Sequence, residues 1–385
     1  MTAKRRAGAK GSEAKRLPAT PARPRLRDLG VRIGRFPSGT NNAITDVAGV
    51  RVGHVTLIDG EGPLRPGMGP VRTGVTAVIP AAGDVFLQRV FAGSFVLNGA
   101  GEMTGLLQVD EWGLCETPIL LTNTLGVGRV ADATISWILR KHPRIGSDFD
   151  VVIPVVAECD DSYLNDAVGR HVTETHVWTA LDGAEAGPVA EGNVGAGTGM
   201  QTFNFSGGIG TSSRRVNTAV IKATVGALVL SNFGDLESLR VDGLPAGKLL
   251  ADRFTHVKRR PSAGSIVVLI ATDAPLLSRQ LSRLCKRGAL ALGRVGGYAA
   301  NNSGELLLSW STTNRVPRER VMHHHTVEIM LDTEMDALYE ATVDVVEEAV
   351  LNAIVAGVPM TGQNHHAVPA LPVDELRDMI RKHRA

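Results

Sequence analysis

Gly264 and Ser265 stand at the start of a strand-forming run, SIVVLIATD. Glycine adopts backbone angles that cost other residues free energy, so the peptide bond before the serine can be bent or strained. If that bond breaks, Ser265 becomes an N-terminal residue with a hydroxyl nucleophile and an α-amine, whose ordinary pKa of about 8 lets it accept a proton at neutral pH. The Ser265 hydroxyl could itself make the cut by attacking the Gly264 carbonyl, giving an ester that water hydrolyses. Taken alone, the dipeptide is more typical of a turn before a strand.

Ser303 and Glu305 could assist such a nucleophile. They are two residues apart in NNSGELLLSWST, so on an extended segment their side chains share one face. A carboxylate in that position can orient a serine hydroxyl or an ammonium group. The alternative without a catalytic role is that the two residues are a polar pair in a loop.

Polar residues also follow two other predicted strands. Glu158, Asp161 and Tyr163 come directly after VVIPVV, and Asn232 ends the strand VLSN. Functional loops gather at the ends of sheets, and a phenol or a side-chain amide is an adequate oxyanion donor. Each of these residues, taken singly, also fits a structural hydrogen-bonding role.

Other motifs point away from nucleotide and metal chemistry. The glycine clusters at 192–200 and 206–213 lack the GxGxxG spacing and are not followed by a Lys-Ser/Thr pair, so flexible or closely packed loops explain them better. The histidines at 323–325 and 365–366 show no HExxH spacing, and adjacent histidines on a strand point to opposite faces, which favours surface loops over a metal site. There is no GxSxG motif, so the sequence offers no nucleophile elbow for the serine of an α/β-hydrolase.

Composition fits an ordinary globular enzyme. Of 385 residues, 43% are apolar and 21% charged, and the 43 glycines with few aromatics suit layered α/β packing. The three cysteines form no CxxC pair, no apolar run approaches the ~20 residues of a membrane helix, and no secretory signal is visible, so we expect a cytoplasmic protein. Residues 1–27 carry nine basic residues and one acid, and we expect a disordered basic tail without a specific nucleic-acid partner.

The remainder, 28–385, contains no linker and predicts a single domain. Helices are predicted from Asp273 as N-cap with Pro275 in the first turn, from Thr333 to Ile354, and over VADATISWILRKHP. Strands are predicted over GVRVGHVTLI, GVTAVIPA, DVVIPVVAE, NTAVIKATVGALVLSN, SIVVLIATD and GELLLSWST. Strands and helices without strict alternation favour stacked mixed layers over a doubly wound parallel sheet.

These segments resemble the L-aminopeptidase/D-esterase family of self-processing serine hydrolases, which includes the β-peptidyl aminopeptidases. The resemblance covers nearly all of the chain after the basic tail, and the segments occur in the family's order. It rests on NNAITDVAGVRVGHVTL, VRTGVTAVIP, NGAGEMTGL, AECDDSYLND, GNVGAGTGM, GSIVVLIATDAPLL and NNSGELLLSWST.

The resemblance implies an α/β fold of the α+β type, a four-layer αββα sandwich shared with the ornithine acetyltransferases. It implies cleavage between 264 and 265 into an α chain (1–264) and a β chain (265–385), and assembly into a tetramer of αβ units. No metal or organic cofactor is implied, and the substrates would be short peptides, amino-acid amides or esters.

Matched position by position, the resemblance also implies the role of each site residue. Ser265 is the nucleophile, Ser303 and Glu305 support it, and Tyr163 and Asn232 stabilise the oxyanion. Glu158 and Asp161 sit where an acid binds the free amine of the substrate. Cys159 and Asp160 depart from the family's pattern near the specificity pocket.

Two other functions remain open from the sequence. An acyl transferase like ornithine acetyltransferase shares the fold and the self-processing but uses threonine as nucleophile, and Ser265 argues against it. An uncleaved, non-catalytic binding protein is the other alternative, and the presence of all five catalytic candidates argues against that.

Overall fold

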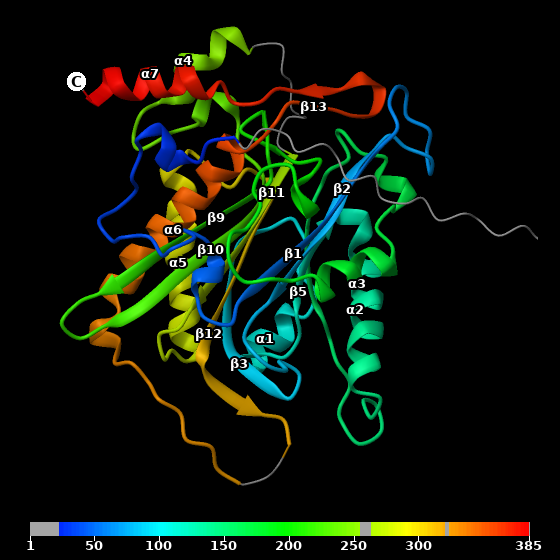
Figure 1. Cartoon of the computed structure of the whole chain (residues 1–385), viewed down its shortest axis with the longest axis vertical. Helices are drawn as coiled ribbons and strands as arrows, with labels where there is room; N and C mark the ends of the chain where they lie inside the picture. The colour runs from blue at the N-terminus through cyan, green and yellow to red at the C-terminus, as the bar shows by residue number, and fades with distance from the viewer. Residues whose placement is uncertain (1–22, 255–262, 320–322, 385) are drawn as a thin grey trace, which may run out of the picture.

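Two β-sheets lie face to face, and each carries helices on its outer face (Figure 1). The structure is a computed structural model that describes residues 23–254, 263–319 and 323–384. Helices α2 and α3 cover the smaller sheet, and α5 and α6 cover the larger one. The expected four-layer αββα sandwich is therefore confirmed.

The smaller sheet has four strands in the order β1-β2-β5-β6. β5 and β6 are parallel, and the other neighbours are antiparallel. The strands are β1 (Arg51–Asp59), β2 (Val71–Ile79), β5 (Ile119–Asn123) and β6 (Val155–Cys159).

The larger sheet has six strands in the order β4-β3-β12-β11-β10-β9. β11 and β12 are its parallel pair. The strands are β3 (Gln88–Gly99), β4 (Leu114–Cys115), β9 (Ile209–Asn217), β10 (Lys222–Asn232), β11 (Ala263–Thr272) and β12 (Asn302–Pro317). Two short hairpins complete the described strands: β7 (Gln201–Thr202) with β8 (Phe205–Ser206), and β13 (Met360–Thr361) with β14 (Ala367–Val368).

Seven α-helices are assigned in the described residues. They are α1 (Leu106–Trp112), α2 (Val127–Lys141), α3 (Glu174–Asp182), α4 (Ala246–Leu250), α5 (Ser278–Arg294), α6 (Asp336–Val355) and α7 (Val373–Arg384).

The hydrophobic core is divided by the layers. Along β11, Val267 and Leu269 face the core between the two sheets, whereas Val268 and Ile270 face the core beneath α5 and α6. A third cluster fills the space between the smaller sheet and the helices α2 and α3. A strand that is buried on both faces needs apolar residues at every position, which explains the unbroken run IVVLIA.

Two predicted helix starts were wrong. The helix predicted from Asp273 with Pro275 in its first turn begins at Ser278 and runs to Arg294. The helix predicted from Thr333 begins at Asp336, after a short 3-10 turn. The Asp273 side chain instead accepts a hydrogen bond from the Thr224 amide at 2.6 Å, and Thr333 lies within the 3-10 turn.

One predicted strand is two. The segment NTAVIKATVGALVLSN begins with the last residue of β9 and turns over 218–221 before entering β10. The Thr218 amide donates a hydrogen bond to the Ile221 carbonyl oxygen at 2.8 Å, and this bond closes the turn between β9 and β10. Apolar residues on either side of a tight turn gave one continuous pattern in the sequence.

The glycine cluster at 192–200 is a closely packed loop. A Cβ atom at Gly74 of β2 would lie 2.3 Å from the Gly195 carbonyl oxygen, and one at Gly197 would lie 2.5 Å from the Ile209 amide. Glycine is required because backbones approach each other there. Of the two loop explanations offered for this cluster, the close-packing one fits.

The predicted N-terminal tail reaches too far into the chain. Residues 23–27 are part of the fold: the Leu26 side chain is fully buried, and Arg27 Nε lies 2.7 Å from Glu348 Oε1 on α6. The remainder of that segment, 1–22, lies outside the described residues. Within the part of the chain that the structure describes, no helix has the length and apolar content needed to span a bilayer.

Candidate active site

The larger sheet places the predicted nucleophile between two strands that carry its candidate helpers. Ser265 pairs with Asn232 of β10 on one side and with Gly304 of β12 on the other. Gly264 pairs with Ser303 in the same parallel register. Hydrogen bonding in the sheet therefore fixes the backbone around the 264–265 peptide bond.

A cavity of about 520 Å³ opens at this point. The residues that follow β5 and β6 of the smaller sheet form its other wall. Of the predicted site residues, Ser265, Tyr163, Asn232, Glu158 and Gly264 line the cavity. Ser303 and Glu305 lie beside it on β12, in the segment that pairs with Gly264 and Ile266.

The Ser265 hydroxyl lies against the peptide bond that precedes it. Its Oγ donates a hydrogen bond to the Gly264 carbonyl oxygen at 2.7 Å, and the residue is 7% exposed. The Ser265 hydroxyl is thus both nearly buried and adjacent to the carbonyl group of the preceding residue.

Ser303 and Glu305 form a buried pair, as their spacing predicted. The Ser303 hydroxyl donates to Glu305 Oε1, and Glu305 Oε2 has no hydrogen-bond partner among the described residues. Burial raises the pKa of Glu305 above its ordinary value, although the bond from Ser303 opposes that rise. One carboxylate oxygen is therefore open to a further donor.

Asn232 is held in a fixed orientation at the end of β10. Its Oδ1 accepts a hydrogen bond from the Gln201 amide at 2.9 Å, and its Nδ2 donates to the Asp160 carbonyl oxygen at 2.8 Å. An amide locked in this way is suited to presenting an N–H to a developing negative charge.

Tyr163 is supported by a residue that the sequence analysis assigned to a surface loop. The His366 ring stacks on the Tyr163 ring with centroids 4.5 Å apart, and His366 Nδ1 lies 2.8 Å from the Tyr163 carbonyl oxygen. His366 is therefore half-buried and packs against Tyr163, whereas His365 is exposed, as expected for a surface loop. The two residues are far apart in the sequence, so no local pattern could indicate this contact.

Glu158 points into the cavity from the end of β6. It is 4% exposed, and its Oε1 accepts a hydrogen bond from the Glu102 amide at 3.0 Å. The Thr124 hydroxyl donates to its other oxygen. Burial raises the pKa of Glu158, and these hydrogen bonds oppose the rise.

Asp161 is not brought to the cavity. It is 1% exposed, and its Oδ1 accepts a hydrogen bond from Asn165 Nδ2 at 2.9 Å. Burial raises its pKa to about 7. Its neighbour Asp160 lines the cavity instead, because successive side chains of the loop point in different directions.

The walls of this cavity are acidic. Glu102, Glu158 and Asp160 line it, and no lysine or arginine is among the described residues that do so. Such a site favours a positively charged group. Neither Glu102 nor Asp160 was predicted as a site residue. The signal for Glu102 is its place in NGAGEMTGL, and the signal for Asp160 is its departure from the family's pattern near the specificity pocket. No group of three or more His, Cys, Asp or Glu residues in the described part of the chain is arranged to hold a metal ion.

Comparison with known proteins assigns the chain to a family. The sequence pattern of Peptidase family S58 matches residues 42–368. The β-peptidyl aminopeptidase of Sphingosinicella microcystinivorans is 45% identical over 374 residues, which cover 94% of this chain and 93% of that protein.

Solved structures agree with this match. A β-aminopeptidase from Burkholderia sp. superimposes with a TM-score of 0.85 at 43% identity, covering 93% of this chain and 98% of the other. The L-aminopeptidase D-Ala-esterase/amidase of Ochrobactrum anthropi, described as a variant of the N-terminal-nucleophile hydrolase fold, has a TM-score of 0.86 at 40% identity and covers 94% and 99%. The chain belongs to peptidase family S58 and is a serine-type aminopeptidase with an N-terminal-nucleophile hydrolase fold.

Proposed function

We propose that the chain cuts itself between Gly264 and Ser265 and then removes N-terminal residues from short peptides, amides or esters. The observation that carries this proposal is the 2.7 Å hydrogen bond between Ser265 Oγ and the Gly264 carbonyl oxygen at the floor of an acidic cavity. The α chain (1–264) and the β chain (265–385) are the products of the cut.

Self-cleavage proceeds through an ester. The Ser265 oxygen attacks the Gly264 carbonyl carbon, the C–N bond breaks, and the proton lost by the hydroxyl passes to the serine nitrogen, which becomes an amine. Water then hydrolyses the ester, which leaves a carboxylate on Gly264 and returns the hydroxyl to Ser265. No oxidant, metal or cofactor takes part.

The freed terminus then acts on substrates. The α-amine of Ser265 accepts the hydroxyl proton as Oγ attacks the substrate carbonyl, and it returns a proton to the leaving amine. The Tyr163 phenol and the Asn232 amide donate to the oxyanion. Water releases the acyl group from Ser265 and completes the cycle.

Glu305 positions the new α-amine. Its buried Oε2 has no hydrogen-bond partner among the described residues, lies on the strand next to Ser265, and can accept a hydrogen bond from an ammonium group. Ser303 holds the other oxygen. Glu305 and Ser303 are therefore positioning residues for the base rather than groups that touch the substrate.

Glu158 recognises the free amine of the substrate. A charge-assisted hydrogen bond to this carboxylate, with Glu102 and Asp160 nearby, favours unblocked N-termini. The related proteins named for β-peptidyl aminopeptidase activity support inclusion of β-amino-acid residues among the substrates. Asp161, buried away from the cavity, shapes the loop and does not contact the substrate.

Two wider expectations accompany this proposal. We propose a cytoplasmic location and a homo-oligomer, expected to be a tetramer of αβ units, whose mass light scattering would measure. A mass equal to a single αβ unit would contradict the oligomer.

Intact-mass measurement followed by assay with an unblocked amino-acid p-nitroanilide tests the function. We expect two fragments that divide at 264/265 and turnover that requires the free amine. Ser265→Ala should stay whole and inactive, whereas Ser162→Ala, which removes another serine of the same cavity, should still split. Splitting of the Ser265→Ala variant, or acetyl transfer without hydrolysis, would overturn the proposal.

A further inference from the structure

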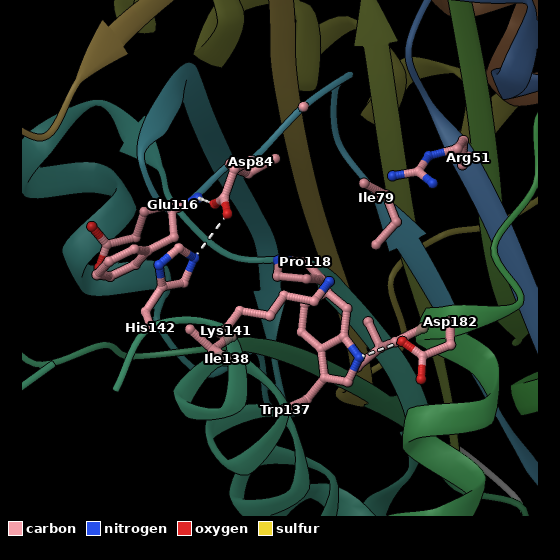
Figure 2. A pocket seen from close by; sticks show the side chains of 14 residues that line it. Arg51, Ile79, Asp84, Glu116, Pro118, Trp137, Ile138, Lys141, His142 and Asp182 are labelled. Atoms are coloured by element: carbon pink, nitrogen blue, oxygen red, sulfur yellow. Dashed lines mark hydrogen bonds and ion pairs between the residues drawn. The ribbon is translucent and has the colours of Figure 1, made fainter. Parts of the chain in front are cut away.

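A second cavity, of about 370 Å³, lies at the opposite end of the smaller sheet from Ser265 (Figure 2). Pro118, directly before β5, lines this cavity, whereas Thr124, directly after β5, lines the first. The strand thus separates the two spaces, and nothing in the proposed mechanism uses the second one.

The floor of this second cavity is apolar and buried. Ile79 from the end of β2, Ile138 from α2 and Leu181 from α3 line it with exposed fractions of 5%, 2% and 3%. Trp137 adds an indole face beside them. Small-molecule sites combine such an apolar floor with a few polar groups, and this volume lies at the lower end of their range.

The acidic residues around the cavity already have partners. Each accepts a hydrogen bond from a nearby side chain. The pairs are Asp84 with His142 at 2.8 Å, Asp182 with the Trp137 indole nitrogen at 2.7 Å, and Glu116 with Arg318.

Among the described residues, the lysine and the arginine that line the cavity, Lys141 and Arg51, have no such partner. The Lys141 ammonium lies 3.4 Å from the centroid of the Trp137 ring, and Arg51 stands opposite Ile79 at the start of β1. Within the described residues, neither side chain has a carboxylate at ion-pair distance. Figure 2 shows Arg51 across the cavity from Asp84, with Lys141 over the indole between them. The cavity therefore offers more N–H donors than its own acceptors use.

The two positive charges act on one another. Partial burial lowers the pKa of Lys141; Asp182 and Asp84 oppose this change, and the charge of Arg51 adds to it. An anion placed between Lys141 and Arg51 would relieve that repulsion and accept hydrogen bonds from both.

We propose that this cavity binds a small organic monoanion, a carboxylate with an apolar body. The carboxylate accepts hydrogen bonds from Lys141 and Arg51, and the apolar body lies on Trp137 and the buried floor. A carboxylate suits the site better than a phosphate ester because the neighbouring Asp84 and Asp182 repel a second negative charge.

Fluorine NMR with the full-length protein tests this site. The probe is 4-fluorophenylacetate, and its neutral counterpart is 4-fluorophenylacetamide. We expect the acid to bind at least about tenfold more tightly than the amide, and Lys141→Met and Arg51→Met each to weaken the acid by about tenfold.

Lys286→Met is the matched control. Lys286 also lies over an aromatic ring, with its Nζ 5.8 Å from the Phe95 centroid, but it is on α5 and does not line the cavity. This variant should bind the acid as the wild type does. Circular dichroism checks that each variant is folded.

The possible results divide cleanly. Equal binding of the acid and the amide, or unchanged binding in both Lys141→Met and Arg51→Met, would overturn the proposal. Tighter binding of 4-fluorophenyl phosphate than of 4-fluorophenylacetate would overturn the choice of a monoanion. Because the Ser265 cavity is acidic, an anionic probe is not expected there, so Ser265→Ala should bind it unchanged.

Discussion

In the proposed mechanism, Glu305 sets the pKa of the base, the α-amine of Ser265. Its buried carboxylate has one oxygen held by Ser303 and one without a partner among the described residues. A carboxylate beside an amine favours the protonated amine and so raises the pKa of that amine. In the cleaved enzyme, the charge of Glu305 should therefore set the acidic limb of the pH–rate profile.

Glu305→Gln keeps the shape of the side chain and removes its charge. We expect kcat to fall by about 100-fold because the base is less well positioned, and we expect the acidic limb of kcat/KM to move to lower pH by about one unit. Ser303→Ala, which keeps the carboxylate, should lower kcat with a smaller shift of that limb. A Glu305→Gln profile that superimposes on the wild type would show that the carboxylate does not act on the base.

Glu158 and Asp161 are the two acids for which the sequence offered the same role, and the structure separates them. Glu158→Gln should raise KM for a free-amine substrate by about 10- to 100-fold, because a charge-assisted hydrogen bond is lost. Asp161→Asn should leave KM unchanged, because that side chain does not line the cavity. Steady-state kinetics with folded variants measures both, and a larger KM effect from Asp161→Asn would reverse the assignment.

At the scale of elements, local patterns predicted the strands and missed their partners. The run IVVLIA indicated a buried strand, and the spacing of Ser303 and Glu305 indicated a shared face; both hold. The pairing of Ser265 with Asn232, 33 positions earlier, depends on which strands are neighbours, and no local pattern carries that information. The resemblance to a family implied that the two residues share one site, but not that their strands pair.

The sequence also did not show the direction in which loop side chains point. Asp160 and Asp161 are adjacent and chemically identical in the sequence, yet only Asp160 lines the cavity. The difference arises because Asn165, four residues on, draws Asp161 into a buried hydrogen bond. Loop side chains follow tertiary contacts rather than a fixed period, which is why the sequence could not show that Asp160, and not Asp161, lines the cavity.

The contact between β9 and α6 depends on the absence of a side chain at Gly210. A Cβ atom there would lie 1.9 Å from the Ala349 carbonyl oxygen, so helix and sheet would have to separate. We expect Gly210→Ala to lower the free energy of unfolding by about 3 kcal/mol. Gly293→Ala on α5 meets nothing within 4 Å and should change it by less than about 1 kcal/mol. Urea denaturation of both variants in the Ser265→Ala background makes the comparison, and equal stabilities would contradict the packing argument.

At the scale of the whole molecule, the proposed cut falls in the middle of a sheet. The order β4-β3-β12-β11-β10-β9 places two strands of the β chain between two pairs of α-chain strands. The core between the sheets also draws on both fragments, with Leu121 and Leu230 from one and Leu269 and Leu308 from the other. Separation of the fragments would expose to water the apolar side chains of strands that are buried on both faces.

The two fragments should therefore remain one cooperative unit after cleavage. We expect them to co-elute in native size-exclusion chromatography at the volume of the whole Ser265→Ala chain and to separate only in denaturant. Hydrogen exchange should give the slowest amides of β10 and β11 the same opening free energy, because neither strand can be exposed without the other. A β chain that elutes alone under native conditions, or protection that differs between these two strands, would contradict the interleaved sheet as the element that joins the fragments.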